Sequence, residues 1–180
     1  MADTIFERFL RNMQAEAMEL QKNSDNVLIA PEAGNPPFRY LVTFKEMSYL
    51  IRNNQGVRLI TAPLNMVINF PEDYLHSLDA NLYLKLVAVL RPDFFHPNVK
   101  FPVVCPGHEF LMTSPGLTEI VSHLYNVFTY RNMNVSEADA LNFEACEYLR
   151  EHGDIIKKIN VIPLRRKKLN VSVKVVELKS

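Results

Sequence analysis

The feature that most constrains the fold is a turn signal between two apolar runs. Asn53-Asn54-Gln55-Gly56 separates the runs 47–51 and 57–60, which is the pattern of a β-hairpin. Further strand patterns occur at 27–30, 38–44, 65–70 and 82–90. Because no helical pattern interrupts this series, the sequence predicts an antiparallel meander.

A helical pattern precedes the strands. Thr4 and Glu7 have the spacing of a capping box, which marks a helix start, and apolar residues then recur on one helical face. That face consists of Ile5, Phe9, Met13, Ala17 and Leu20. We therefore expect an amphipathic first helix that ends near residues 23–26.

Two further helices are predicted after the strands. Ser114-Pro115 predicts a helix start, followed by an apolar face that extends to Phe128. Ser136 and Asp139 form a second capping-box pattern, and that helix is expected to continue through Leu141 and end at Gly153. The fold class is thus α+β.

The remaining segments are two stretches without a strong helix or strand pattern and a C-terminal stretch beyond the predicted domain. Residues 31–37 are proline-rich and predict a loop, and 94–113 is irregular, as functional segments often are. The basic run 165–168 precedes a strand pattern at 169–178. We predict a domain over 1–153 and a C-terminal extension over 154–180.

Composition excludes several classes of protein. Lys and Arg total 20 and Asp and Glu total 20, so the basic excess of a nucleic-acid binder is missing. The two cysteines, Cys105 and Cys146, are too few for a disulfide-rich scaffold or a four-cysteine zinc site. The charged N-terminus is unlike a signal peptide, and no apolar run is long enough to span a membrane. We expect a cytoplasmic protein that binds neither nucleic acid nor membrane.

Five short motifs occur in a characteristic order along residues 1–152. They are Phe70-Pro71-Glu72-Asp73-Tyr74, His96-Pro97-Asn98, Ser114-Pro115-Gly116-Leu117-Thr118, Asp139-Ala140-Leu141-Asn142 and Glu144-Ala145. With Cys105 after the tripeptide, this order resembles the ubiquitin-conjugating enzyme family. The resemblance implies that family's fold, with an N-terminal helix, a four-stranded meander and following helices.

The chain departs from the family's usual pattern at several points. Pro106 stands where the family usually has Leu, and Thr113 where it usually has Trp. The segment between Asn98 and Cys105 is shortened, and a basic linker and strand pattern replace the terminal helices. The chain therefore looks like a divergent member. It looks more like the conjugating-enzyme relatives encoded in bacterial ubiquitin-like operons than like a standard eukaryotic enzyme, which suggests a role in antiphage defence.

The resemblance implies an acyl transfer on Cys105. This thiol would attack the thioester that holds a modifier on its activating enzyme, and an amine would then attack the new thioester. Sulfur suits both steps because it is a good nucleophile and a good leaving group. The amide of Asn98 would either stabilise the tetrahedral oxyanion or hold the active-site loop, and both interpretations stay open.

The other motif residues have supporting roles by the same resemblance. His96 would brace the loop and Pro97 would stiffen it. Asp139 would assist the attacking amine, although its place in a capping box also explains an acid there. Cys146 lies among apolar residues at helical spacing and is interpreted as a core residue.

The expected partners follow from the resemblance. They are ubiquitin or a ubiquitin-like protein, its activating enzyme, and a ligase. Arg8 and Arg11 on the first helix are candidates for contact with the activating enzyme, and Ser114 and Pro115 are candidates for partner binding. No cofactor and no metal are expected.

Four other interpretations of the motif region compete with the conjugating enzyme. Cys105-Pro106-Gly107-His108 resembles half a zinc site, but no second ligand pair follows at motif spacing. A Cys–His hydrolase would pair Cys105 with His108 or His96. An inactive module of the same fold would only bind a partner, although such modules usually lose the cysteine. A related interaction domain of the cysteine-free type is argued against by His96-Pro97-Asn98.

Overall fold

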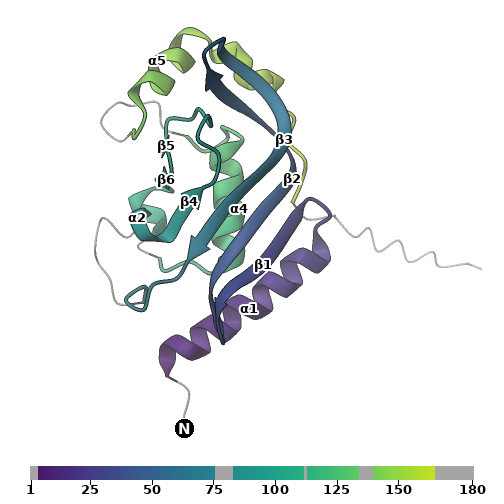
Figure 1. The fold of residues 1–180 in the computed structure, drawn as a ribbon, viewed down its shortest axis with the longest axis vertical. Coiled ribbons are helices and arrows are strands. Elements are labelled where there is room, and N and C mark those ends of the chain that lie inside the picture. The colour runs from purple at the N-terminus through teal and green to yellow at the C-terminus, as the bar shows by residue number, and fades with distance from the viewer. Residues whose placement is uncertain (1–3, 76–82, 112, 134–139, 165–180) are drawn as a thin grey trace, which may run out of the picture.

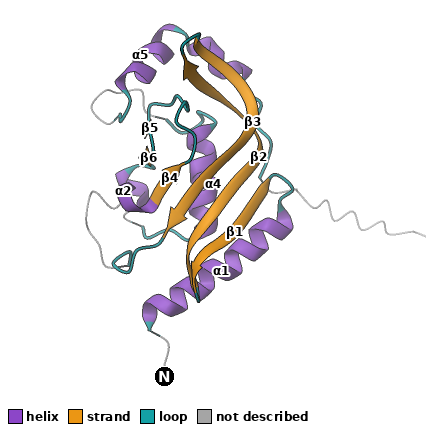
Figure 2. Cartoon of the chain, in the orientation of Figure 1, coloured by secondary structure: helices purple, strands orange, loops and turns teal. Residues whose placement is uncertain are grey.

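The computed structural model describes residues 4–75, 83–111, 113–133 and 140–164. These residues form an α+β fold, with an N-terminal helix and a six-stranded antiparallel sheet (Figures 1 and 2). The strands are β1 (Val27–Gly34), β2 (Pro37–Asn53), β3 (Gly56–Asn69), β4 (Val87–Val89), β5 (Val99–Lys100) and β6 (Val103–Val104). The helices are α1 (Ile5–Asn23), α2 (Tyr83–Leu86), α3 (His108–Leu111), α4 (Leu117–Phe128), α5 (Phe143–Glu151) and the 3-10 helix η2 (Gly153–Lys158).

The sheet has two more strands than the four-stranded meander that the family resemblance implies. Its order is β1-β2-β3-β4-β6-β5, so the first four strands neighbour one another in chain order. The added strands β5 and β6 have two residues each and join β4 through the pair Ala88↔Val103. Strands this short carry no alternating pattern that a sequence analysis can detect.

The predicted hairpin and the predicted first helix are both confirmed. β2 and β3 pair in register down to Asn53↔Gly56, and Gly56 has a φ of +100° that favours glycine. The side chain of Thr4 accepts a hydrogen bond from the backbone N–H of Glu7, and the Glu7 carboxylate accepts one from the N–H of Thr4. This reciprocal capping starts α1.

Two predicted segments have a different structure. The segment 31–37 is not all loop, because β1 continues to Gly34; Pro31 is tolerated on this edge strand, next to a bulge. The predicted strand 82–90 contains the short helix α2 before β4 begins at Val87. A short apolar run does not distinguish a strand from a buried helical turn.

The predicted ends of the later helices also need correction. α4 is capped by Gly116, not by Ser114, because Pro115 stays outside the helix and its carbonyl accepts a hydrogen bond of 2.7 Å from the Tyr74 hydroxyl. α5 ends at the C-cap residue His152, and Gly153 opens η2 instead of ending α5.

The N-terminus of α5 differs from the prediction as well. Leu141 precedes the helix, and the Asn142 side chain caps it by accepting a hydrogen bond from the backbone N–H of Ala145 over 3.2 Å. The predicted cap pair Ser136 and Asp139 lies outside the described residues.

Helices cover one side of the sheet. α1 packs on β1 and α4, and α4 lies behind the central strands (Figure 1). The main core fills this space with residues such as Phe44, Leu124 and Phe128. A second, smaller cluster lies beside the β2–β3 turn, where α5 is located. It contains Leu50, Phe95, Tyr130, Ala145, Leu149 and Ile159.

Part of the predicted C-terminal extension lies against the domain. Ile159 is buried in the smaller cluster, and the Tyr125 hydroxyl donates to the carbonyl of Ile162 over 2.6 Å. The division at 153/154 stays a prediction, and 165–180, with the basic run and the strand pattern, lies outside the described residues. In the described part of the chain, none of the helices has the length and apolar character required to span a membrane.

Candidate functional site

Asn98 and Cys105 face each other across the β5–β6 hairpin. The pair Val99↔Val104 brings the residues that flank this hairpin together. The Cys105 N–H donates to the Asn98 carbonyl over 2.8 Å, and Asn98 Nδ2 donates to the Cys105 carbonyl over 3.1 Å. Cys105 is a partly exposed, free thiol at the end of β6. The structure thus places the two predicted catalytic residues side by side.

Within the residues that the structure describes, the Asn98 side-chain amide is hydrogen-bonded through its Nδ2 atom only. Its Oδ1 atom is buried and has no hydrogen-bond partner among the described residues. A buried oxygen in this state costs roughly 1–3 kcal/mol. The Asn98 side chain is therefore oriented so that Nδ2 bonds to Cys105, and its Oδ1 atom is left without a hydrogen bond in the described structure.

His96 lies in the core and braces the loop through both ring nitrogens. Its Nδ1 accepts from the Asn98 N–H over 3.0 Å, so its Nε2 carries the proton and donates to the Val127 carbonyl over 2.8 Å. Burial lowers the pKa of His96 to about 3, against the opposing effect of the hydrogen bond to Val127. Its ring also contacts Tyr130, with 4.4 Å between ring centroids. Because both nitrogens bind backbone groups, His96 cannot activate Cys105 as a hydrolase base.

Pro97 links the His-Pro-Asn loop to the start of α5. Its carbonyl accepts hydrogen bonds from the N–H groups of Leu141 and Asn142, each over 3.0 Å. This contact brings Leu141 and Asn142, from the described part of the Asp139-Ala140-Leu141-Asn142 motif, to the loop. Asp139 itself lies outside the described residues, so its role stays a prediction.

The C-terminal side of Cys105 is held by α4. Nε2 of His123 donates to the Pro106 carbonyl over 2.5 Å, and the His123 ring stacks on Phe110 of α3. Gly107, between them, has a φ of +100°. Sequence analysis did not identify His123 because its contact joins α4 to a loop through tertiary packing, which no motif spacing reveals.

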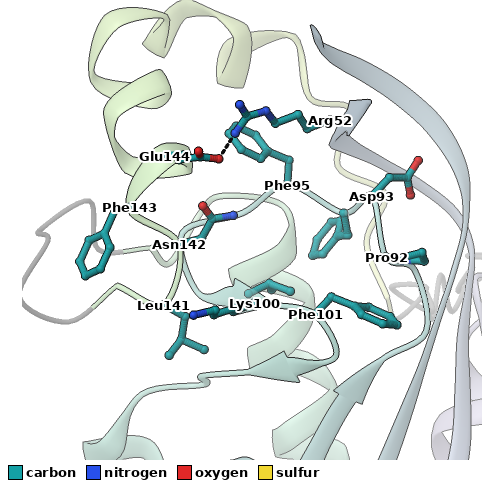
Figure 3. Close-up of a pocket in the computed structure, with 12 residues that line it drawn as sticks. Arg52, Pro92, Asp93, Phe95, Lys100, Phe101, Leu141, Asn142, Phe143 and Glu144 are labelled. Atoms are coloured by element: carbon teal, nitrogen blue, oxygen red, sulfur yellow. Dashed lines mark hydrogen bonds and ion pairs between the residues drawn. The ribbon is translucent and has the colours of Figure 1, made fainter. Parts of the chain in front are cut away.

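A groove of about 450 Å³ borders the same loop (Figure 3). Phe101 and Phe143 line it and are about half exposed, at 49% and 59%. Arg52 of β2 pairs with Glu144 of α5 across one side and lies over the Phe95 ring. Cys105 is not among the residues that line this groove. Exposed aromatic side chains gathered in a groove are typical of a protein-binding surface.

The other predicted site residues lie apart from Cys105. Cys146 is fully buried in α5, as its core interpretation expects. Arg8 and Arg11 are on exposed positions of α1, and Ser114 is exposed with a φ of +47°. Pro115 is buried instead, and its carbonyl accepts a hydrogen bond from the Tyr74 hydroxyl.

The described residues contain no group of three or more His, Cys, Asp or Glu side chains that could hold a metal ion. The side chain of His108, the second member of the possible half-site, lies outside the described part. No family model matches the chain, and the search of curated proteins finds no match.

Proposed function

We propose that this protein is a ubiquitin-like-protein conjugating enzyme with the fold of the ubiquitin-conjugating family. The Cys105 thiolate attacks the thioester carbonyl of a modifier on its activating enzyme, and the activating enzyme's thiolate leaves. An amine then attacks the Cys105 thioester, which forms an amide, releases the Cys105 thiolate and passes the amine proton to water. The modifier and the activating enzyme are thus the proposed partners, with a ligase as a further one, in the cytoplasm.

The pair of hydrogen bonds between Asn98 and Cys105 carries this proposal. It joins the cysteine to the His-Pro-Asn motif through both backbone and side chain. A thiol that acts as an acyl carrier must be reachable, and Cys105 is partly exposed, whereas Cys146 is buried.

Contacts between the other motifs support the same proposal. The carbonyl of Pro97 binds the N–H groups of Leu141 and Asn142, and the Tyr74 hydroxyl binds the carbonyl of Pro115. Each contact joins two of the motifs that carry the family resemblance although they are separated along the chain. Chance tripeptides scattered along a chain would have no reason to meet in this way.

Asn98 is proposed to hold the loop in the resting state. Its Nδ2 already binds the Cys105 carbonyl, so an oxyanion would receive only its second hydrogen or a rotated amide. The same observation favours one alternative, an inactive module of this fold that binds a ubiquitin-like protein. In that case the bond between Asn98 and Cys105 would be purely structural.

Thioester formation separates the two functions. The protein would be incubated with ATP and with each of a panel of modifiers, ubiquitin included, together with the activating enzyme of each. The conjugating enzyme gives a reductant-sensitive adduct that Cys105→Ala abolishes and Cys146→Ala retains. An adduct that persists in Cys105→Ala contradicts the proposal. Modifier binding without any adduct across the panel favours the inactive module.

A further inference from the structure

The two sides of Cys105 are held by different parts of the fold. On one side, Asn98 binds the N–H and the carbonyl of Cys105 itself. On the other side, the next carbonyl along the chain, that of Pro106, accepts a hydrogen bond from His123. Both peptide units that flank Cys105 are therefore tied to Asn98, and the following unit, between Pro106 and Gly107, is tied to α4.

The His123 ring is fixed in direction as well as in distance. It lies parallel to Phe110, with 3.8 Å between ring centroids and 6° between ring planes. Since a carbonyl can only accept, the His123 nitrogen that faces Pro106 carries the proton. Burial lowers the pKa of His123, against the opposing effect of the hydrogen bond to Pro106.

This restraint matters because the hydrogen bonding at the start of the following segment is weak, although Leu111 at its end is buried in the main core. Gly107 adopts a left-handed conformation, and α3 is a single turn whose Leu111 N–H reaches the Gly107 carbonyl over 3.3 Å. A long bond in a one-turn helix is a weak restraint. The contact from His123 is the short bond between this segment and the rigid helix α4.

We propose that His123 is a positioning residue for Cys105: by holding the Pro106 carbonyl, it keeps the thiol in the orientation that acyl transfer requires. The inference rests on the proposed function for its catalytic consequence. Misplacing a reacting group by about 1 Å can slow a reaction by up to about 100-fold, so a lost loop restraint is expected to slow transfer.

Two substitutions of similar size separate hydrogen bonding from packing. His123→Leu keeps an apolar contact with Phe110 but cannot donate. His123→Gln can donate, because its amide nitrogen lies as many bonds from Cα as Nε2 of histidine. His152→Leu is a matched control, since His152 also stacks on an aromatic ring, Tyr148, but lies at the C-terminus of α5. If the leucine variant does not fold, His123→Asn replaces it, because its amide is too short to reach Pro106.

The first readout needs no modifier. Hydrogen exchange of the Cys105 N–H, which is bonded to Asn98, is expected to accelerate about fivefold in His123→Leu. It should stay near the wild-type rate in His123→Gln and His152→Leu. Equal exchange in the leucine and glutamine variants overturns the positioning role, whether or not the protein is a conjugating enzyme.

The second readout is discharge of the Cys105 thioester to free lysine under single-turnover conditions. The maximal rate is expected to fall about tenfold in His123→Leu, with an unchanged half-saturating lysine concentration, and to recover in His123→Gln. Equal rates in the leucine and glutamine variants overturn the inference. A wild-type protein that forms no thioester with any modifier instead counts against the proposed function, and the exchange measurement still decides the role of His123.

Discussion

The side-chain amide of Asn98 donates to the carbonyl of Cys105 over 3.1 Å, while the Cys105 N–H donates to the carbonyl of Asn98 over 2.8 Å. The two residues thus form a closed pair at the base of the β5–β6 hairpin. A side chain that binds the backbone of the reactive residue controls where that residue lies, which gives Asn98 a testable structural role.

Asn98→Ala is expected to loosen this pair. The lost hydrogen bond should destabilise the protein by about 1 kcal/mol and accelerate exchange of the Cys105 N–H, because the loop opens more often. Exchange and denaturant unfolding measure the two effects. If exchange is unchanged while acyl transfer falls 100-fold or more, Asn98 acts on the oxyanion instead.

His96 makes the stability of the protein depend on pH. Its pKa is about 3 when folded and about 6.5 in an unfolded chain, so the unfolded state takes up a proton between these values. Stability contributed by neutral His96 is therefore present near pH 7 and lost as the pH falls below about 6.5. Between pH 7 and pH 5 the loss is about 2 kcal/mol.

His96→Gln isolates this contribution, because glutamine can donate to the Val127 carbonyl and does not titrate. Denaturant unfolding at pH 7 and pH 5 would give the free energy of unfolding of the wild type and of the variant. The variant should lose about 2 kcal/mol less than the wild type between the two pH values. Equal losses in both proteins would mean that His96 is not held neutral by burial.

The two thiols should differ sharply in reactivity. Iodoacetamide is expected to modify Cys105 in the folded protein, because this thiol is partly exposed, and to modify Cys146 only after unfolding, because it is fully buried. Peptide mapping with and without denaturant checks this. Labelling of Cys146 in the folded protein at a rate similar to that of Cys105 would contradict the structure of α5.

The groove in Figure 3 gives a prediction about protein acceptors. Replacing both Phe101 and Phe143 with Ala removes two exposed aromatic rings. Transfer to protein acceptors should fall about tenfold, because aromatic side chains often dominate interface energy, while transfer to free lysine should be unchanged. Leu28→Ala, on an exposed position of β1, is the matched control. Equal losses with both acceptors would show that the groove acts on the thioester itself.

Local signals in the sequence were sufficient for part of the fold. The Asn53–Gly56 turn and the Thr4–Glu7 capping box depend on neighbouring residues only, and both occur as predicted. The start of α4 could not be predicted, because the hydroxyl of Tyr74 binds the Pro115 carbonyl from a distant part of the chain. The start of α5 depends on a local cap, Asn142, whereas the prediction placed the cap pair at Ser136 and Asp139.

The residues of the candidate site likewise include some that the sequence could predict and some that it could not. Motif order was enough to select Asn98 and Cys105, which the structure brings together. It gave no sign of His123, whose bond to Pro106 spans 17 positions along the chain. The ion pair between Arg52 and Glu144 spans 92 positions and is likewise a product of packing.

The central claim is that Cys105 carries a modifier as a thioester, and the chemistry of the adduct tests it most directly. Cys105→Ser replaces sulfur with oxygen, so the adduct becomes an oxyester that thiols do not cleave readily. We predict that dithiothreitol releases the modifier from the wild type but not from Cys105→Ser, and that hydroxide releases it from both. An adduct equally sensitive to dithiothreitol in both proteins would show that another residue carries the modifier.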